Sequence, residues 1–98
     1  MITRIVRMVF QEDKTDAFEA VFDASKEKIR ARSGCQYLSL HRDHHSPNVY
    51  YTISKWDAQQ DLDDYRNSEL FKTTWAKTKF LFADKPSAYS LEQVIDLP

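Results

Sequence analysis

Three histidines are the residues of this chain whose type is best suited to acid–base chemistry. His41 lies within an alternating pattern typical of a strand, and an imidazole titrates near neutral pH, so His41 is the candidate general base. The alternative is a hydrogen-bonded structural histidine. His44 and His45 follow with Asp43 in a turn, where adjacent side chains point apart and no fourth ligand is suitably spaced. We therefore predict no metal site.

Aromatic residues are frequent enough to line a pocket for a flat aromatic ligand, at 13% of the chain. Trp56 is the strongest candidate, because it ends a predicted strand just before a predicted helix, a common position for a pocket rim. The other aromatic candidates are Tyr50, Tyr51, Tyr65, Trp75 and Tyr89. The alternative for each is an ordinary core position, since aromatic side chains dominate cores by area.

Composition excludes several classes of function. Fourteen basic against fifteen acidic residues give a net charge of −1, which argues against nucleic-acid or membrane-surface partners. The single glycine, Gly34, cannot build a Rossmann or P-loop phosphate site. The single cysteine, Cys35, has no local base and is expected to be an inert apolar residue. One thiol, with no signal segment or apolar run of membrane length, favours a cytoplasmic protein.

The elements that must position these residues form one domain over residues 1–98. Alternating patterns predict strands at residues 2–10, 36–42, 49–55 and 88–96. The spacing of Phe18, Val21, Phe22, Ser25 and Ile29 predicts a first helix, with Asp13 as its N-cap. A second helical region is broken near Asn67–Ser68: Asp57 and Gln60 resemble a capping box, Ser68 caps the second part, and Pro86 stops it.

The order β-α-β-β-α-β is that of a ferredoxin-like α+β fold, a four-stranded antiparallel sheet with helices on one face. Apolar residues occupy both parities of the strands, for example Ile5 and Val9 against Val6 and Met8. A half-solvated sheet alternates more cleanly. We therefore predict that a second subunit covers the other face, giving a homodimer through the sheet. RNA-binding modules of this fold carry a glycine-rich basic third strand, which residues 49–55 lack.

One face of the last helical pattern carries two threonines among apolar residues. This face comprises Leu70, Phe71, Thr74, Trp75, Thr78, Leu81 and Phe82. The hydroxyls of Thr74 and Thr78 either point into the interior or bond the carbonyl one turn back. We expect an aromatic-lined cavity between sheet and helices, bounded by Trp56 and reached by at least one of His41, Tyr51 and Tyr65.

Several segments together resemble the antibiotic biosynthesis monooxygenase family, of dimeric α/β-barrel fold. They are a first strand ending Arg-Met-Val-Phe, then Ser33-Gly34-Cys35, then the strand end Trp56-Asp57, and then residues 65–71. The resemblance covers nearly the whole chain. The haem-degrading branch of this family uses an Asn, a Trp and a His. In this chain an apolar residue near Val6 replaces the Asn, Tyr65 replaces the Trp, and Trp75 replaces the His. The resemblance therefore implies no haem, and we predict no cofactor.

The resemblance implies a cofactor-independent monooxygenase that acts with O₂ on a small aromatic quinol or polyhydroxylated phenol. Trp56 and Tyr51 would supply stacking surface, His41 the base, and Arg42 or Arg4 the charge partner. Thr52 stands where some cofactor-free members place a substrate-holding Asn, and Tyr65 and Trp75 complete the expected substrate contacts. The alternative is a non-catalytic dimeric module of the same fold that binds a small ligand or serves as a scaffold.

Overall fold

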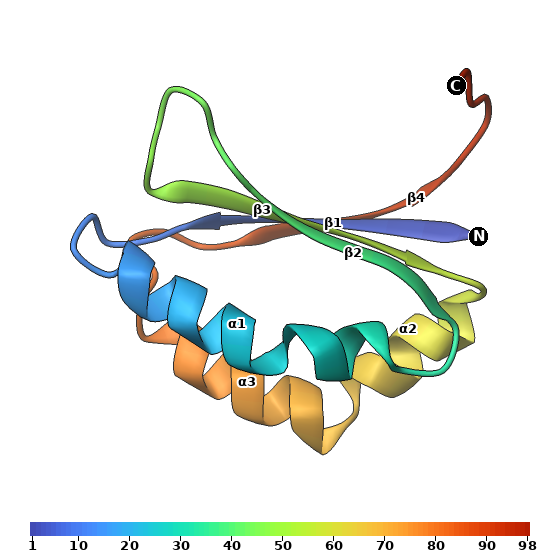
Figure 1. Cartoon of the computed structure of the whole chain (residues 1–98), viewed down its shortest axis with the longest axis horizontal. Helices are drawn as coiled ribbons and strands as arrows, with labels where there is room; N and C mark the ends of the chain where they lie inside the picture. The colour runs from blue at the N-terminus through green and yellow to red at the C-terminus, as the bar shows by residue number, and fades with distance from the viewer.

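Four strands form one antiparallel sheet, and three helices cover one of its faces (Figure 1). The computed structural model describes all 98 residues. The strands are β1 (Ile2–Val9), β2 (Cys35–Arg42), β3 (Val49–Trp56) and β4 (Ser87–Glu92), in the spatial order β2-β3-β1-β4. The helices are α1 (Thr15–Arg30), α2 (Gln59–Arg66) and α3 (Glu69–Lys79). The predicted ferredoxin-like α+β fold is confirmed.

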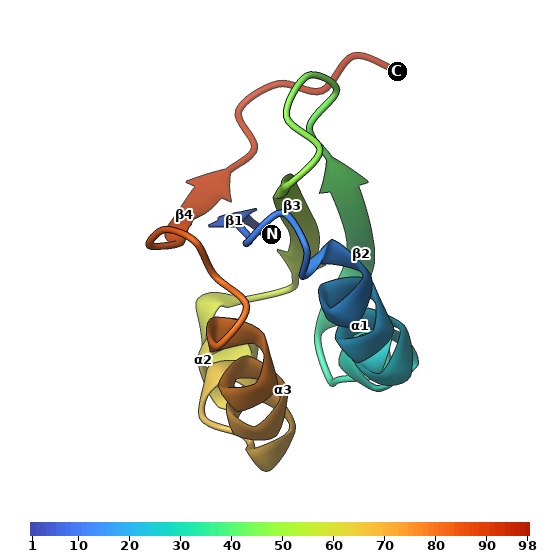
Figure 2. The same ribbon diagram turned by 90° about the vertical axis from the view of Figure 1, so that its left-hand side faces the viewer.

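The helices divide between the two halves of the sheet. Figure 2 shows α1 beneath the side of the sheet that holds β2, and α2 and α3 beneath the side that holds β4. The opposite face of the sheet carries no helix, and only the loop between β2 and β3 and the C-terminal segment rise on that side (Figure 1). No helix is long and apolar enough to span a membrane.

The break in the second helical region is confirmed, and Ser68 caps α3 by accepting a hydrogen bond from the Phe71 amide at 3.2 Å. The predicted capping box of α2 is wrong. Ala58 is the N-cap and offers no side-chain hydrogen bond. Asp57 accepts from the Gln36 amide at 3.2 Å instead, and the Gln60 amide donates to Asp64 at 2.8 Å. Both members of the predicted pair are therefore engaged elsewhere.

Three other predicted ends also differ from the structure. The N-cap of α1 is Lys14 rather than Asp13, because the Phe18 amide donates to the Lys14 carbonyl and closes the first turn one residue later. Helix α3 ends at Lys79, well before Pro86. Just after this end, the Phe82 amide donates a hydrogen bond to the Lys79 carbonyl in a tighter turn. Strand β4 ends at Glu92 instead of residue 96, since its pairing with β1 runs out at Ile2, where β1 begins.

Two groups of buried side chains attach the helices to the sheet, one towards each end of the strands. One group is centred on Phe10, whose ring stacks on Phe18 with centroids 4.2 Å apart. The other is centred on Trp56, which packs with Cys35 and Leu62. Phe10 and Trp56 are both fully buried, at 0% exposure. Burial of an aromatic side chain stabilises the fold in proportion to the apolar area that it removes from water, so these two groups fix the helix layer in place.

Gly34 connects α1 to β2 in a left-handed conformation, with φ of 82°. A Cβ at this position would lie 2.2 Å from the Asp61 side chain on α2. Gly34 also accepts a hydrogen bond from the Asp57 amide at 2.8 Å, which ties the start of β2 to the end of β3. The glycine is needed both for its backbone angle and for the close approach of α2.

We predict that Gly34→Ala destabilises the fold by about 1–2 kcal/mol from the left-handed backbone alone, with a further loss from the contact with Asp61. Urea denaturation measures the free energy of unfolding. The double variant Gly34→Ala/Asp61→Ala removes the carboxyl atoms that lie closest but leaves the Cβ of residue 61 at 2.6 Å and keeps the backbone strain, so it should recover only part of the loss. A Gly34→Ala variant as stable as wild type would contradict the prediction.

Candidate functional site

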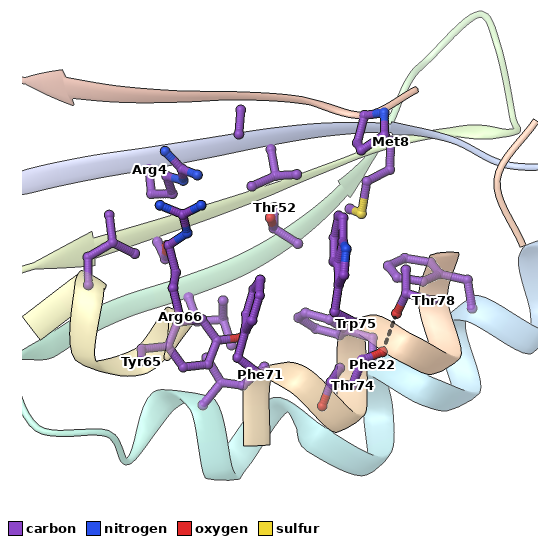
Figure 3. Close-up of a pocket in the computed structure, with 18 residues that line it drawn as sticks. Arg4, Met8, Phe22, Thr52, Tyr65, Arg66, Phe71, Thr74, Trp75 and Thr78 are labelled. Carbon is purple, nitrogen blue, oxygen red and sulfur yellow. Dashed lines mark hydrogen bonds between the residues drawn. The ribbon is translucent and has the colours of Figure 1, made fainter. Parts of the chain in front are cut away.

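A cavity of about 300 Å³ lies between the sheet and the three helices (Figure 3). Eighteen residues line it, and eleven of them are hydrophobic, so its wall is mainly apolar. The sheet supplies Arg4, Val6, Met8, Leu38, Thr52, Ser54 and Ala88. The helices supply Phe18, Phe22, Ile29, Leu62, Tyr65, Arg66, Phe71, Thr74, Trp75 and Thr78, and Pro86 follows α3.

Small side chains in the middle of the sheet leave the space for this cavity. Val6 on β1 lies between Thr52 on β3 and Ala88 on β4. Next along the strands, Arg4 lies between Ser54 and Ser90. No large apolar side chain on these central positions reaches down to the helices, whereas Phe10 and Trp56 fill the ends. Side chains normally fill the space between packed layers, so this cavity follows from the small residues at the centre of the sheet.

Three aromatic rings form one wall of the cavity along α2 and α3 (Figure 3). The Tyr65 ring meets the Phe71 ring edge-on at 5.3 Å, and the Phe71 ring stacks with the Trp75 ring at 5.8 Å with 10° between planes. Phe71 and Trp75 lie one helical turn apart, at a spacing of i, i+4. This wall offers flat apolar surface to an aromatic ligand.

Trp56 lies behind this wall, and its side chain does not line the cavity. Its ring stacks on Tyr65 with centroids 5.2 Å apart, and its indole N–H donates to the Ser54 hydroxyl at 2.9 Å. Trp56 therefore positions Tyr65 from the core side. Its place at the end of a strand, which made it a candidate for the pocket rim, instead puts it in the buried group with Leu62.

Tyr65 presents a phenolic hydroxyl that has no hydrogen-bond partner in the protein. Burial raises the pKa of this hydroxyl to about 12, with a smaller contribution from Cys35. The group is therefore a neutral hydrogen-bond donor throughout the physiological pH range. Tyr65 can donate to an oxygen atom of a ligand in the cavity.

The two threonines of α3 behave differently. The Thr78 hydroxyl donates to the Thr74 carbonyl one turn back, at 2.8 Å, and is internally satisfied. The Thr74 hydroxyl makes no such bond, and Thr74 lines the cavity beside Phe71 and Trp75 (Figure 3). Thr52 lines the same cavity from the sheet. Thr74 and Thr52 are thus the two lining threonines whose hydroxyls have no hydrogen-bond partner in the protein.

His41 and Tyr51 lie on the opposite face of the sheet. Every strand residue that lines the cavity has an even number, and successive strand side chains point to opposite faces. His41 pairs with Tyr51 across β2 and β3, and its Nε2 lies 2.9 Å from the exposed Ser39 hydroxyl. His41 and Tyr51 therefore do not line the cavity, and Tyr65 is the one of the three expected residues that reaches it.

Arg42 is exposed at the end of β2, beside the Tyr50 hydroxyl, and does not line the cavity. Arg4, the alternative charge partner, does line it. Sequence reasoning missed Arg66, which follows Tyr65 at the end of α2. A cation at a helix C-terminus is common, so the pattern gave no signal of a site.

The cavity holds no acidic side chain and no histidine, cysteine or lysine among its lining residues. Its polar groups are the guanidiniums of Arg4 and Arg66 and the hydroxyls of Ser54, Tyr65 and the threonines. No cluster of three or more His, Cys, Asp or Glu side chains that could hold a metal ion is present. The cavity is thus built to bind and polarise a ligand through neutral or positive donors.

Comparison with known proteins identifies relatives of this fold. A family model described as antibiotic biosynthesis monooxygenase matches residues 1–77. A search of the curated proteins found no significant match. A solved antibiotic biosynthesis monooxygenase is 18% identical, with a TM-score of 0.91 over 97% of this chain and 100% of that chain.

Two other solved structures are similarly close in shape. A Mycobacterium tuberculosis protein is 20% identical, with a TM-score of 0.90 over 99% of this chain and 98% of that chain. A Caulobacter crescentus protein is 23% identical, with a TM-score of 0.90 over 96% of this chain and 90% of that chain. At these identities the structures establish the shared fold and nothing finer.

The raised pKa of Tyr65 predicts a specific loss of stability at high pH. The phenol titrates near 10 in the unfolded chain and at about 12 in the folded one, so the folded state retains its proton longer. The stability that this proton contributes is fully present below pH 10 and is lost as the pH rises through 12. The expected loss is roughly 2–3 kcal/mol.

Urea denaturation of wild type and Tyr65→Phe between pH 9 and 12 tests this prediction. The difference in the free energy of unfolding between the two proteins should fall across that range. Tyr89→Phe is the matched control, because Tyr89 is 56% exposed. If the difference between wild type and Tyr65→Phe stays constant with pH, the assignment of the raised pKa to Tyr65 is refuted.

Proposed function

Because this chain belongs to the antibiotic biosynthesis monooxygenase family, we propose that it oxygenates a small, flat, electron-rich aromatic substrate with O₂ and without a cofactor. The observation that carries this proposal is the cavity of about 300 Å³ with the aromatic wall of Tyr65, Phe71 and Trp75. Its size and apolar lining suit a hydroquinone or polyhydroxylated phenol.

The reducing equivalents in this reaction come from the substrate itself. A hydroquinone with a free ring C–H reacts with one O₂ to give a hydroxyquinone and one water. One oxygen atom replaces the ring hydrogen, the other leaves as water, and the substrate loses four electrons. An ionised hydroquinone gives up its first electron to O₂ more readily than the neutral form, so the protein must favour the anion.

The residues of the cavity suit that task. The neutral Tyr65 hydroxyl donates a hydrogen bond to the substrate oxygen that carries the charge, and the positive field of Arg4 favours the anion further. The aromatic wall stacks on the ring, and Thr52 contacts it from the sheet. His41 lies across the sheet, so in this proposal the substrate loses its proton to water and not to a side chain.

Trp75→Ala should raise the KM for a hydroquinone substrate about tenfold or more, because it removes stacking surface from the cavity wall. Oxygen uptake over a panel of hydroquinones and polyhydroxylated phenols measures this, after subtraction of the uncatalysed rate. Phe80→Ala is the matched control, since Phe80 is an aromatic residue at the end of α3 that is 75% exposed. Uptake equal to the blank for every compound would refute the proposed reaction.

A non-catalytic ligand-binding module is the second candidate. The absence of any acidic or basic catalyst among the lining residues, apart from two arginines that stay protonated, favours it. The two candidates differ in outcome. Phenols raise the melting temperature of a binding module, which does not consume them. A monooxygenase consumes O₂ in proportion to the substrate.

The functional unit that we propose is a homodimer through the open face of the sheet. Large apolar side chains lie on that face without a cover, and Tyr37, Tyr89 and Leu91 are 42%, 56% and 45% exposed. They are joined there by half-buried Tyr51 and Ile53. Exposed apolar patches of this kind mark interfaces in small proteins, and a second copy offers a matching surface by symmetry.

Ile53→Glu should convert the dimer to a particle of 11.6 kDa, because it places a charge in the middle of the proposed interface. Static light scattering after gel filtration measures the mass. Ala20→Glu introduces the same charge on the exposed surface of α1 and should leave the dimer intact. Wild-type protein of 11.6 kDa at micromolar concentration would rule out the dimer.

A further inference from the structure

Arg4 places a charged group at a position of the sheet where the fold normally buries an apolar side chain. It lies on the helix-facing side of β1, and its guanidinium donates one hydrogen bond, to the Ser90 hydroxyl at 3.0 Å. No carboxylate lies within ion-pair distance. A guanidinium has five N–H donors, so most of the donors of Arg4 find no protein acceptor.

Arg66 brings a second guanidinium to the same end of the cavity from the last turn of α2 (Figure 3). It forms no side-chain hydrogen bond or ion pair with the protein. Burial and the charge of Arg66 both lower the pKa of Arg4, so the two like charges lie close enough to repel each other. Asp63 offsets part of that repulsion, but its carboxylate accepts from the Gln59 amide at 2.9 Å.

These two arginines are the only charged residues that line the cavity. Arg66 is exposed and Arg4 is partly buried, and no carboxylate lies within ion-pair distance of either, so the two like charges repel each other in the empty protein. An anion bound between the two guanidiniums relieves that repulsion. The rest of the lining is apolar and aromatic, so the same ligand must carry an apolar body.

We propose that the cavity binds an aromatic carboxylate, with the carboxylate held between Arg4 and Arg66 and the ring against Phe71 and Trp75. This inference rests on the proposed function, since it names the class of substrate or ligand for that cavity. It adds a specific requirement, namely an anionic group that is separate from the oxidised phenol.

A carboxylate fits the two arginines better than the other available anions. Its two oxygens lie in one plane and accept paired hydrogen bonds from a guanidinium, and it is ionised at neutral pH. A phenolate offers one oxygen and is mostly protonated at that pH, because phenols titrate near 10. A phosphate carries a larger charge and a larger hydration shell, which the mainly apolar lining does not match.

Isothermal titration calorimetry with two unreactive naphthalenes tests the proposal. The probes are 2-naphthoate and 2-naphthamide, which have the same ring and nearly the same shape but differ in charge. The wild-type protein should bind 2-naphthoate at least about tenfold more tightly than 2-naphthamide, because a charge-assisted hydrogen bond is stronger than a neutral one. Arg66→Gln and Arg4→Gln should each remove most of that preference without weakening 2-naphthamide.

Arg7→Gln is the matched control for the charge. Arg7 lies on the same strand, three residues from Arg4 and on the opposite face, so the preference for 2-naphthoate should be unchanged. Arg66→Gln alters an exposed side chain and keeps the test valid if Arg4→Gln fails to fold. Equal affinities for the two probes, or a preference that survives both substitutions, would overturn the proposal. Tighter binding of 2-naphthyl phosphate than of 2-naphthoate would overturn the choice of carboxylate.

Oxygen uptake separates this inference from the proposed reaction. 1,4-Dihydroxy-2-naphthoate and 1,4-dihydroxynaphthalene share the oxidisable ring, and only the first carries the carboxylate. If neither is consumed while 2-naphthoate still binds through the arginines, the reaction fails and the ligand class stands. If both are consumed with equal KM and no dependence on Arg66, the reaction stands and the ligand class fails.

Discussion

The architecture depends on the unequal filling of one face of the sheet. Phe10 and Trp56 anchor the helices towards the two ends of the strands, and each is completely buried. Between them, Thr52, Ser54 and Ala88 are too small to reach the helix layer. The groups around Phe10 and Trp56 hold the helix layer away from the small residues at the centre of the sheet, so the cavity follows from this mismatch in side-chain size.

The position of the cavity decides its chemistry. It lies between the sheet and the helices and opens to solvent, and its strongest polar groups are two guanidiniums and a protonated phenol. Positive charge and neutral donors favour anions, and the apolar aromatic wall favours a ligand with a flat apolar body. A site of this kind stabilises negative charge on a ligand but has no side chain suited to accept a proton. Any reaction in it must start from a substrate that ionises readily.

The alternation of the strands separates the site from a second surface. The same pleat that turns Arg4 towards the helices turns Arg7 and Tyr51 to the open face, together with His41. Aromatic and apolar residues on that face have no partner within the chain, whereas those on the other face form the core and the cavity wall. The two faces therefore carry different tasks, ligand binding on one and, in our proposal, subunit contact on the other.

The sequence by itself determined the order of the elements, the ferredoxin-like fold, the break at Ser68 and the family. Alternation, helical periodicity and a side-chain cap are local signals, and they act between residues close in the chain. It also identified Tyr65, Trp75, Thr52 and Arg4, all of which line the cavity. These residues sit on faces that periodicity assigns to the interior.

Only the tertiary structure decided which candidates meet. His41 and Tyr65 both have the chemistry of a site, but one points above the sheet and the other below it. The parity of β2 relative to the helices depends on its register with β3, including an irregularity between Cys35 and Tyr37, and register is a long-range property. The approach of Arg66 to Arg4 is likewise set by how α2 packs, because the two residues are far apart in the chain and close only in the folded protein.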